Sequence, residues 1–510
     1  MYKANELPFP FWGAKTSSKG GRDPLAVQNS SVVIYTNMIT GITNVTGRVR
    51  YNGFFCWLLT LIAKRLEQVD IDKIDDPKEQ IKLIRRGELL LAFIMLDSYK
   101  EVTGVSGSIF AAGNFNEGLI DLAWGADFDN KSKHKIYWQN PYGIFGQYYV
   151  GVLSQLKLLY LPGGKHKTYR ATEDGLRLAD IYAESFASDV ENTFWDAIYT
   201  GEIAKDKLAS MKKFALHIIE NENELNEYQK IFIKPDKQDI DGNNINHRIN
   251  SIKLIMEYIR TTGKDVLPKN FVLAFLRFNF EHVLGNIKNA TTEQLSWFLY
   301  ELNELSHAAY ESFHFATLYS ITEEPKPLNT ILGALQKDFD SYKSNEETDD
   351  IYSIYNNVTQ SYIEQNYGGL LFEAAHMLIA LYKAIESNIE FLINFGQSEN
   401  YRHPGFAPTL LTRLVDKSAF VNWEFVENCL YNAINDHLKS SYSKSTIGQG
   451  LVHNYMVEDE LIWRLRRTEP IRTSPRLQNV LQYIEDMKWI ELTGDYYTIT
   501  ERGLNVLKNV

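Results

Sequence analysis

Two segments far apart in this 510-residue chain, residues 169–176 and 497–504, share the pattern Y-x-x-T-E-x-G-L. In each segment the threonine is a typical helix N-cap, and the glutamate falls in the first turn, where the helix dipole favours an anion. The glycine allows the new helix to pack closely against a preceding hairpin. Each segment also follows an apolar helix pattern, a short strand pattern and a turn. The repeated pattern therefore predicts the same helix–hairpin–helix arrangement twice.

The C-terminal copy, within residues 474–510, has the clearer signals. An amphipathic helix leads to a strand, a Thr493-Gly494-Asp495 turn, a second strand and a short final helix. This order resembles the second half of a winged helix-turn-helix. We therefore expect one such unit at 471–510 and another at 137–187.

The segment between these units has the spacing of long helices. We expect helices near residues 189–200, 204–220, 247–262, 268–286, 292–319, 328–343, 348–366, 369–396, 409–416, 422–439 and 451–468. The expected fold is mainly α, a multidomain helical protein with two winged helix-turn-helix-like units and small β-hairpins. The expected segments are an N-terminal arm and helical domain (1–136), a winged-helix-like unit (137–187), a helical body (188–400), a helical connector with a basic run (401–470) and a C-terminal winged-helix-like unit (471–510).

Composition places the chain among globular proteins, because 44% of its residues are hydrophobic. A net charge of −11 argues against a surface coated in nucleic acid, although a local basic face is compatible with it. Two cysteines in apolar runs give neither a disulfide framework nor a cysteine zinc site. The apolar runs at 88–96 and 368–381 are shorter than a membrane span and are expected to be buried helices. The N-terminus lacks a signal-peptide pattern, so we expect a cytoplasmic protein.

Residues 43–57 contain the pattern T-x-R-x-R-Y-x-x-F-x-x-W, formed by Thr46, Arg48, Arg50, Tyr51, Phe54 and Trp57. This run resembles the opening motif of an uncharacterised bacterial family, although Thr40-Gly41 stands where that family has Pro-Gly. The resemblance covers about the first 180 residues and implies a gene context of phage defence or mobile elements, without an assigned chemistry. Arg48 and Arg50 are either anion-binding residues near a helix start or ion-pair partners that fix the loop.

A basic run precedes the C-terminal unit, and a smaller basic cluster lies on the wing of the first. Such residues can contact phosphates, while glutamine and asparagine on the C-terminal helix can read base edges. The candidate DNA-binding residues are Lys165, Lys167, Arg170, Arg464, Arg466, Arg467, Arg472, Arg476, Gln478, Asn479 and Gln482. Acidic residues lie close by, and winged helices often bind proteins, so DNA and a partner protein remain alternatives.

Two candidate catalytic or metal patterns are weaker. Arg277 and His282 match the R-x4-6-H spacing of HEPN-type ribonucleases, in which the histidine and arginine act on RNA phosphodiesters. Glu304 with His307, and Glu373 with His376, form two E-x-x-H pairs such as di-iron bundles use. The further glutamates that such a bundle needs are not evident, so histidines in ordinary structural positions are the competing interpretation.

We therefore expect a non-enzymatic, DNA-associated or complex-assembly component of a bacterial anti-phage or mobile-element system, without a cofactor. Its partners would be DNA, proteins encoded nearby or a second copy of the chain, and no membrane. The alternatives are a HEPN-like ribonuclease and an architectural subunit resembling kleisins, with winged helices far apart.

Overall fold

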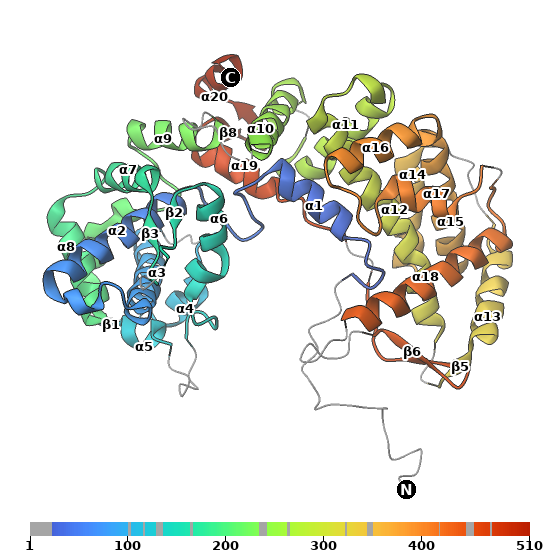
Figure 1. Ribbon diagram of the computed structural model, residues 1–510, viewed down its shortest axis with the longest axis horizontal. Helices are drawn as coiled ribbons and strands as arrows, with labels where there is room; N and C mark the ends of the chain where they lie inside the picture. Colours follow the sequence, from blue (N-terminus) through green and yellow to red (C-terminus); the bar gives the residue numbers. More distant parts are fainter. Residues whose placement is uncertain are drawn as a thin grey trace, which may run out of the picture. The chain divides into compact units, whose positions relative to one another are not determined.

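The computed structural model describes residues 23–99, 104–115, 118–128, 136–163, 167–233, 242–262, 266–321, 324–343, 350–417, 419–444, 453–469 and 472–509 (Figure 1). These residues fold mainly into α-helices with a few short strands, so the expected mainly helical class is confirmed. They form two compact units. Unit 1 comprises the described residues up to Thr36 together with Leu276–Thr473, and unit 2 comprises Asn37–Phe275 together with the described residues from Ser474 onward.

Unit 2 is built on two long helices near its beginning, which pack against later elements. Its α-helices are α2 (Tyr51–Val69), α3 (Pro77–Tyr99), α4 (Ser108–Gly113), α5 (Leu122–Ala126), α6 (Val150–Gln155), α7 (Glu173–Ala183), α8 (Ser188–Thr200), α9 (Glu222–Ile233), α10 (Gly242–Thr262), α19 (Leu477–Asp486) and α20 (Glu501–Asn509). Shorter 3-10 or π turns are Ile71–Lys73, Phe145–Tyr149, Lys205–Phe214 and Pro268–Asn270. Its strands are β1 (Leu119–Asp121), β2 (Leu159–Tyr160), β3 (Arg170–Ala171), β4 (Glu202–Ala204), β8 (Ile490–Thr493) and β9 (Tyr496–Ile499), paired antiparallel as β1–β4, β2–β3 and β8–β9.

Two segments of unit 2 repeat one arrangement. We call residues 150–163 and 167–183 the N-terminal hairpin module, and residues 477–509 the C-terminal hairpin module. In each, a helix ends at a lysine with positive φ, Lys157 at 57° and Lys488 at 59°. The next residue donates its N–H five residues back, from Leu158 to Leu153 O and from Trp489 to Ile484 O, both at 2.8 Å. These are Schellman helix ends, and each leads directly into the first strand of a hairpin.

A threonine closes each module in the same way. The Thr172 hydroxyl accepts from Gly175 N at 3.1 Å and donates to Lys157 O at 2.6 Å. The Thr500 hydroxyl accepts from Gly503 N at 3.1 Å and donates to Lys488 O at 2.6 Å. A Cβ on Gly175 would lie 2.0 Å from Leu158 O, and one on Gly503 would lie 2.1 Å from Trp489 O. The shared sequence pattern thus corresponds to one shared backbone geometry.

The loop of residues 40–50, which carries the opening motif, contacts both modules. Gly41 N donates to the Gln155 side chain at 3.1 Å. From the other module, Asn479 donates to Thr46 O at 3.2 Å, and Asp486 accepts from Val49 N at 3.2 Å. In Figure 1 the red C-terminal elements lie beside the green α9 and α10, in agreement with the packing of α20 and β9 on α10.

Unit 1 surrounds a single long helix, α12. Its α-helices are the first part of α1 (Asn29–Met38), the second part of α11 (Phe271–Leu284), α12 (Thr292–Ser320), α13 (Leu328–Ser341), α14 (Ile351–Ile363), α15 (Tyr367–Ile385), α16 (Ile389–Ser398), α17 (Ala407–Leu414) and α18 (Trp423–Lys444). Short 3-10 turns are Ile287–Asn289 and Glu386–Asn388, and the strands β5 (Lys326–Pro327), β6 (Tyr455–Glu458) and β7 (Leu461–Arg464) pair in the order β5–β7–β6. Helix α12 packs mainly against α15, α18, α13 and α17 (Figure 1).

Several local predictions were wrong. The helix expected at 451–468, within the expected helical connector, is the β6–β7 hairpin. Its turn residues Asp459 and Glu460 both have positive φ, which ends any helix there and suits a tight hairpin. The helix expected at 204–220 is β4 followed by a 3-10 turn, and α9 was not predicted. Apart from these local elements, both hairpin modules belong to unit 2.

Candidate functional site

The two arginines of the opening motif have partners within the chain. Arg48 donates to Asp486 at 2.7 Å. Arg50 is 2% exposed and binds both oxygens of Glu224 at 2.8 and 3.0 Å. It also donates to main-chain oxygens of residues 213, 215 and 218. These contacts match the ion-pair alternative rather than an anion-binding role.

On the wing of the N-terminal hairpin module, Lys165 lies outside the described residues. Lys167 is exposed. Arg170 donates to Ile74 O at 3.0 Å and to Asp75 at 3.2 Å, so its charge is partly balanced inside the chain. Among the described predicted residues of this wing, Lys167 is therefore the one that projects into solvent.

The basic run is divided between the two units. Arg464 ends β7, and Arg466 and Arg467 follow it in unit 1, where Arg467 lies 5.0 Å from the centre of the Tyr319 ring. Arg472 also belongs to unit 1, and it forms ion pairs with Glu301 and Glu304. Arg476 belongs to unit 2, precedes α19 and donates to Ile42 O at 3.0 Å.

The three predicted base-reading residues lie on α19. Gln478 is exposed. Asn479 donates to Thr46 O, and Gln482 donates to Glu485 and Asp486 at 3.2 and 3.1 Å. Gln478 also has a side-chain hydrogen bond with Tyr497, so all three amides already have partners within unit 2.

The exposed apolar residues of the two hairpin modules are equivalent. Leu161 stands at the same distance after Lys157 as Leu492 does after Lys488, so the two leucines are equivalent. They are 53% and 51% exposed. Counting from the capping threonines, Leu176 corresponds to Leu504, and they are 43% and 36% exposed. Around the C-terminal pair the solvent-exposed side chains include Glu491, Asp495 and Glu501. Lys488 and Lys508 of the same module are exposed as well, so its surface is apolar with a small excess of acidic side chains.

Arg277 and His282 share the exposed face of α11. Arg277 forms an ion pair with Glu281 at 2.8 Å and lies 4.6 Å from the centre of the Tyr352 ring. His282 lies parallel to the Phe278 ring at 6.1 Å. The two residues are on one surface, but a carboxylate already balances the arginine.

The two E-x-x-H pairs lie on different helices. Glu373, on α15, accepts from Tyr342 at 3.0 Å, and its nearest contact to His376 is 3.8 Å. Glu304 and His307 lie on α12 and are both buried. In the part of the chain that the structure describes, no three His, Cys, Asp or Glu side chains are placed to share a metal ion.

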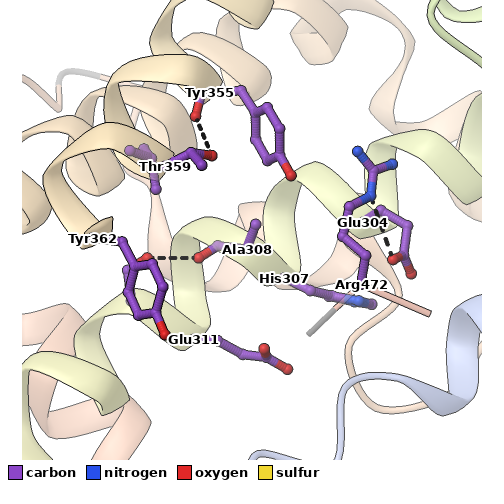
Figure 2. Close-up of a pocket in the computed structure, with 10 residues that line it drawn as sticks. Glu304, His307, Ala308, Glu311, Tyr355, Thr359, Tyr362 and Arg472 are labelled. Carbon is purple, nitrogen blue, oxygen red and sulfur yellow. Dashed lines mark hydrogen bonds and ion pairs between the residues drawn. The ribbon is translucent and has the colours of Figure 1, made fainter. Parts of the chain in front are cut away.

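Glu304, His307 and Arg472 instead come together at one cavity in unit 1, with a volume of about 170 Å³ (Figure 2). Helix α12 forms one wall and α14 forms the opposite wall, while Arg472 lies at one end. The lining residues are Glu304, His307, Ala308, Glu311, Ser312, Tyr355, Val358, Thr359, Tyr362 and Arg472. Figure 2 shows Tyr355 toward the Arg472 end and Tyr362 toward Glu311.

At the Arg472 end the charges are closely paired. Arg472 donates to Glu301, and its guanidinium lies 3.9 Å from Glu304. Thr473 donates its N–H and its hydroxyl to Glu304, both at 2.7 Å. Burial raises the pKa of Glu301 and Glu304, and the nearby Arg472 acts against that rise.

In the middle of the cavity the tautomer of His307 follows from its contacts. Its Nε2 lies 2.7 Å from Gly405 O, and a carbonyl only accepts, so Nε2 carries the proton. Burial lowers the pKa of His307 to about 4, so the ring is neutral near pH 7. Its Nδ1 is therefore an unprotonated acceptor, and that buried atom has no hydrogen-bond partner among the residues that the structure describes.

The sequence contained part of this site. Glu304 and His307 stood out as an E-x-x-H pair, and Glu311 follows His307 at a spacing that keeps it on the same helix face. Three polar residues at these intervals on one face of the helix were the available signal. Tyr355 and Tyr362 come from another helix, and no sequence pattern connected them with α12.

One helical stretch, Tyr367–Ser398, is long and apolar enough for a membrane span, but 72% of its most apolar window is buried inside the protein. Comparisons with known proteins give no assignment: no family model, no curated protein and no solved structure matches the chain.

Proposed function

We propose that this chain is a non-enzymatic assembly component whose hairpin modules, interpreted as winged helix-turn-helix units, bind a partner protein. The observation that carries the proposal is the pair of equivalent exposed leucines on each module, Leu161 with Leu176 and Leu492 with Leu504. Exposed apolar side chains that recur at equivalent positions of two modules are typical of protein-binding surfaces.

The charge of the C-terminal hairpin module favours a protein over DNA. Binding of DNA requires cations that displace the counterions of the phosphates. Here the exposed carboxylates of Glu491, Asp495 and Glu501 outnumber the exposed lysines, Lys488 and Lys508. Arg502 forms an ion pair with Glu222 at 2.6 Å. An acidic, apolar surface complements a basic, apolar surface on a partner.

The cellular setting of the proposal rests on the opening motif. Its resemblance implies a bacterial defence or mobile-element context, and we propose a cytoplasmic protein whose partner is encoded by a neighbouring gene. In the structure this motif supports the proposal indirectly, because its loop holds both modules within unit 2.

Co-purification tests this proposal. The full chain would be co-expressed with the products of the adjacent genes, and complexes would be detected by native mass spectrometry. We expect Leu492→Asp to abolish the complex, because it places a carboxylate in an apolar contact. Ile109→Asp is the matched control, since Ile109 is 90% exposed and lies on α4, which is part of neither module.

Fluorescence anisotropy with a DNA duplex tests the alternative, which is that the chain binds DNA. Salt-dependent binding of DNA that is lost in Lys167→Glu or in Arg466→Glu/Arg467→Glu would overturn the protein-docking proposal. A complex that Leu492→Asp leaves intact would also contradict it. If the wild-type chain forms only a homo-oligomer that Leu492→Asp disrupts, the partner is a second copy of the chain.

A ribonuclease function is the second candidate, because Arg277 and His282 share one exposed helix face. It predicts RNA cleavage by the purified chain that His282→Ala abolishes. The kleisin-like alternative was based on winged-helix units far apart in the sequence. Both modules belong to unit 2, which does not support that alternative.

A further inference from the structure

Three buried polar residues of unit 1 meet at a place that the α12–α14 cavity does not include. His314 lies on α12, His437 lies on α18, and Asn454 directly precedes β6. Each of the three is at most 2% exposed, and the two imidazole rings lie 4.6 Å apart. We call these three residues the histidine cluster. Because water is excluded from them, their hydrogen bonds within the protein decide which protonation state is stable.

The contacts of His437 fix it in one neutral tautomer. Its Nε2 accepts the backbone N–H of Asn454 at 3.0 Å, and its Nδ1 lies 3.1 Å from Pro24 O. A backbone N–H only donates and a carbonyl only accepts, so Nδ1 carries the single proton. The Ser441 hydroxyl lies 3.3 Å from both ring nitrogens and can rotate to suit either state. A second proton, on Nε2, would face the Asn454 N–H and break that hydrogen bond.

Asn454 joins the β6–β7 hairpin to both helices. Its carbonyl oxygen accepts the N–H groups of Leu465 at 2.7 Å and Arg466 at 3.0 Å, directly after β7. Its side-chain amide donates to His314 Nε2 and to the Thr468 hydroxyl, both at 2.9 Å. One residue therefore connects the two ends of the hairpin with α12, and its backbone N–H connects them with α18. Loss of its two bonds to the imidazoles would detach this end of the hairpin from both helices.

The titratable groups around the cluster act against a positive charge on it. Burial lowers the pKa of His437 to about 4, and the nearby His453 and Lys444 act in the same direction. Lys444 also lies 3.9 Å from Asp23, so that carboxylate already has a cation beside it. The Tyr455 ring lies 4.5 Å from the His437 ring, and burial raises its pKa well above the ordinary value, so it stays uncharged. The closed arrangement therefore requires a neutral His437.

We propose that the histidine cluster is an acid-sensitive switch, which releases the β6–β7 hairpin from α12 and α18 when His437 takes up a second proton. Burial and the neighbouring His437 also lower the pKa of His314 well below its ordinary value. Once exposed to water, an imidazole returns to a pKa of roughly 6.5. The stability that the closed cluster supplies is thus complete above that pH, and it is lost progressively as the pH falls toward 4. The switch belongs to unit 1 and is independent of the partner binding proposed for unit 2.

Hydrogen exchange of the full chain, read by mass spectrometry at about pH 7.5 and about pH 5, tests the proposal. Rates are first corrected for the pH dependence of exchange in an unfolded peptide. We expect peptides within 453–465 to exchange at least about tenfold faster at the lower pH, because the released histidine binds a proton that the closed one does not. Peptides of α15 are the internal reference, and we expect their corrected rates to change much less.

Two glutamine variants assign the effect to one histidine. In His437→Gln the new amide can accept from Asn454 and donate to Pro24 but does not titrate. We therefore expect the acid effect on the hairpin to fall below about threefold, with His314 supplying the remainder. His307→Gln is the matched control, because His307 is also buried on α12, and burial also lowers its pKa to about 4. We expect the hairpin of that variant to keep the wild-type response to acid.

The proposal is overturned by any of three results. These are equal corrected rates in the hairpin at both pH values, an α15 that accelerates as much as the hairpin, or an unchanged acid effect in His437→Gln. The second result would mean that acid unfolds unit 1 as a whole instead of releasing one element. If His437→Gln fails to fold, the wild-type comparison of the hairpin with α15 still decides. Loss of the acid effect in His307→Gln would also overturn the proposal, because another histidine would then control the hairpin.

Discussion

The two hairpin modules have the same backbone hydrogen bonds but different side chains at one equivalent position. The residue two before the αL lysine is Gln155 in one module and Asp486 in the other. Both accept an N–H from the loop of residues 40–50, Gln155 from Gly41 and Asp486 from Val49. The comparison shows that a neutral amide and a carboxylate can fill one structural role, although only the carboxylate adds an ion pair and a titratable group.

The shared backbone requires a glycine at one position of each module. We expect Gly175→Ala and Gly503→Ala each to destabilise its own module by about 3 kcal/mol, because the new methyl group would overlap a main-chain oxygen. Hydrogen exchange of module peptides is the appropriate measurement, because a chain of two units need not unfold in one step.

Gly151→Ala is the control for these glycines. Gly151 lies within α6 with nothing near its added Cβ, so alanine there should stabilise the helix by up to about 1 kcal/mol. Hydrogen exchange in Gly175→Ala and Gly503→Ala could instead be as slow as in the wild type. The two modules would then not share the close approach of a glycine to a main-chain oxygen.

The difference between the modules predicts a difference in pH dependence. Burial raises the pKa of Asp486 to about 6, despite the opposing effect of Arg48. The folded protein thus retains this proton to higher pH than the unfolded chain, and stability of the C-terminal module should fall as pH rises from about 4 to 6. The expected change is at most about 3 kcal/mol.

Asp486→Asn isolates this effect. We expect the decrease between pH 4 and 6 to disappear from hydrogen exchange of α19 in the variant. Gln155→Glu should introduce no decrease of this kind in α6, since Gln155 is exposed and a carboxylate there stays in contact with water. A pH profile of α19 that is identical in wild type and Asp486→Asn would contradict the raised pKa.

The smallest effect concerns the lysines with positive φ. Lys157→Gly and Lys488→Gly should each stabilise its module by about 0.5 kcal/mol, because glycine avoids the left-handed penalty but loses some of that gain to unfolded-state entropy. Destabilisation of one module alone would show that its lysine side chain makes a contact that the other lacks. Thermal denaturation measures the change in overall stability of each variant, and hydrogen exchange assigns that change to one module.

Local signals in the sequence predicted the modules well. The capping threonine and close-packed glycine act within a few residues of each other, so Y-x-x-T-E-x-G-L was sufficient to identify both copies. The same reasoning failed at β6–β7, because its turn uses Asp459 and Glu460 rather than glycine or asparagine. Apolar residues in that hairpin also fit a helix period, and the turn residues gave no opposing signal.

Distant pairing limited the prediction of the site. Arg472 was read as part of a basic run, but its partners Glu301 and Glu304 lie on a helix far earlier in the chain. Likewise, the sequence placed Glu304 and His307 on one face but could not connect them with Tyr355. The charge of a segment therefore indicated that it would form ion pairs, but not with which residues of the chain.

The division of unit 1 has a consequence during synthesis. Ser30 and Gln28, near the beginning of the chain, contact His307 and Glu311 on α12. At ribosomal rates of about 5–20 residues per second, the first segment emerges on the order of ten seconds or more before α12 exists. Unit 2 likewise needs α20, which leaves the ribosome last. The nascent chain thus exposes unfinished apolar surface for most of its translation, which makes it a natural client for chaperones.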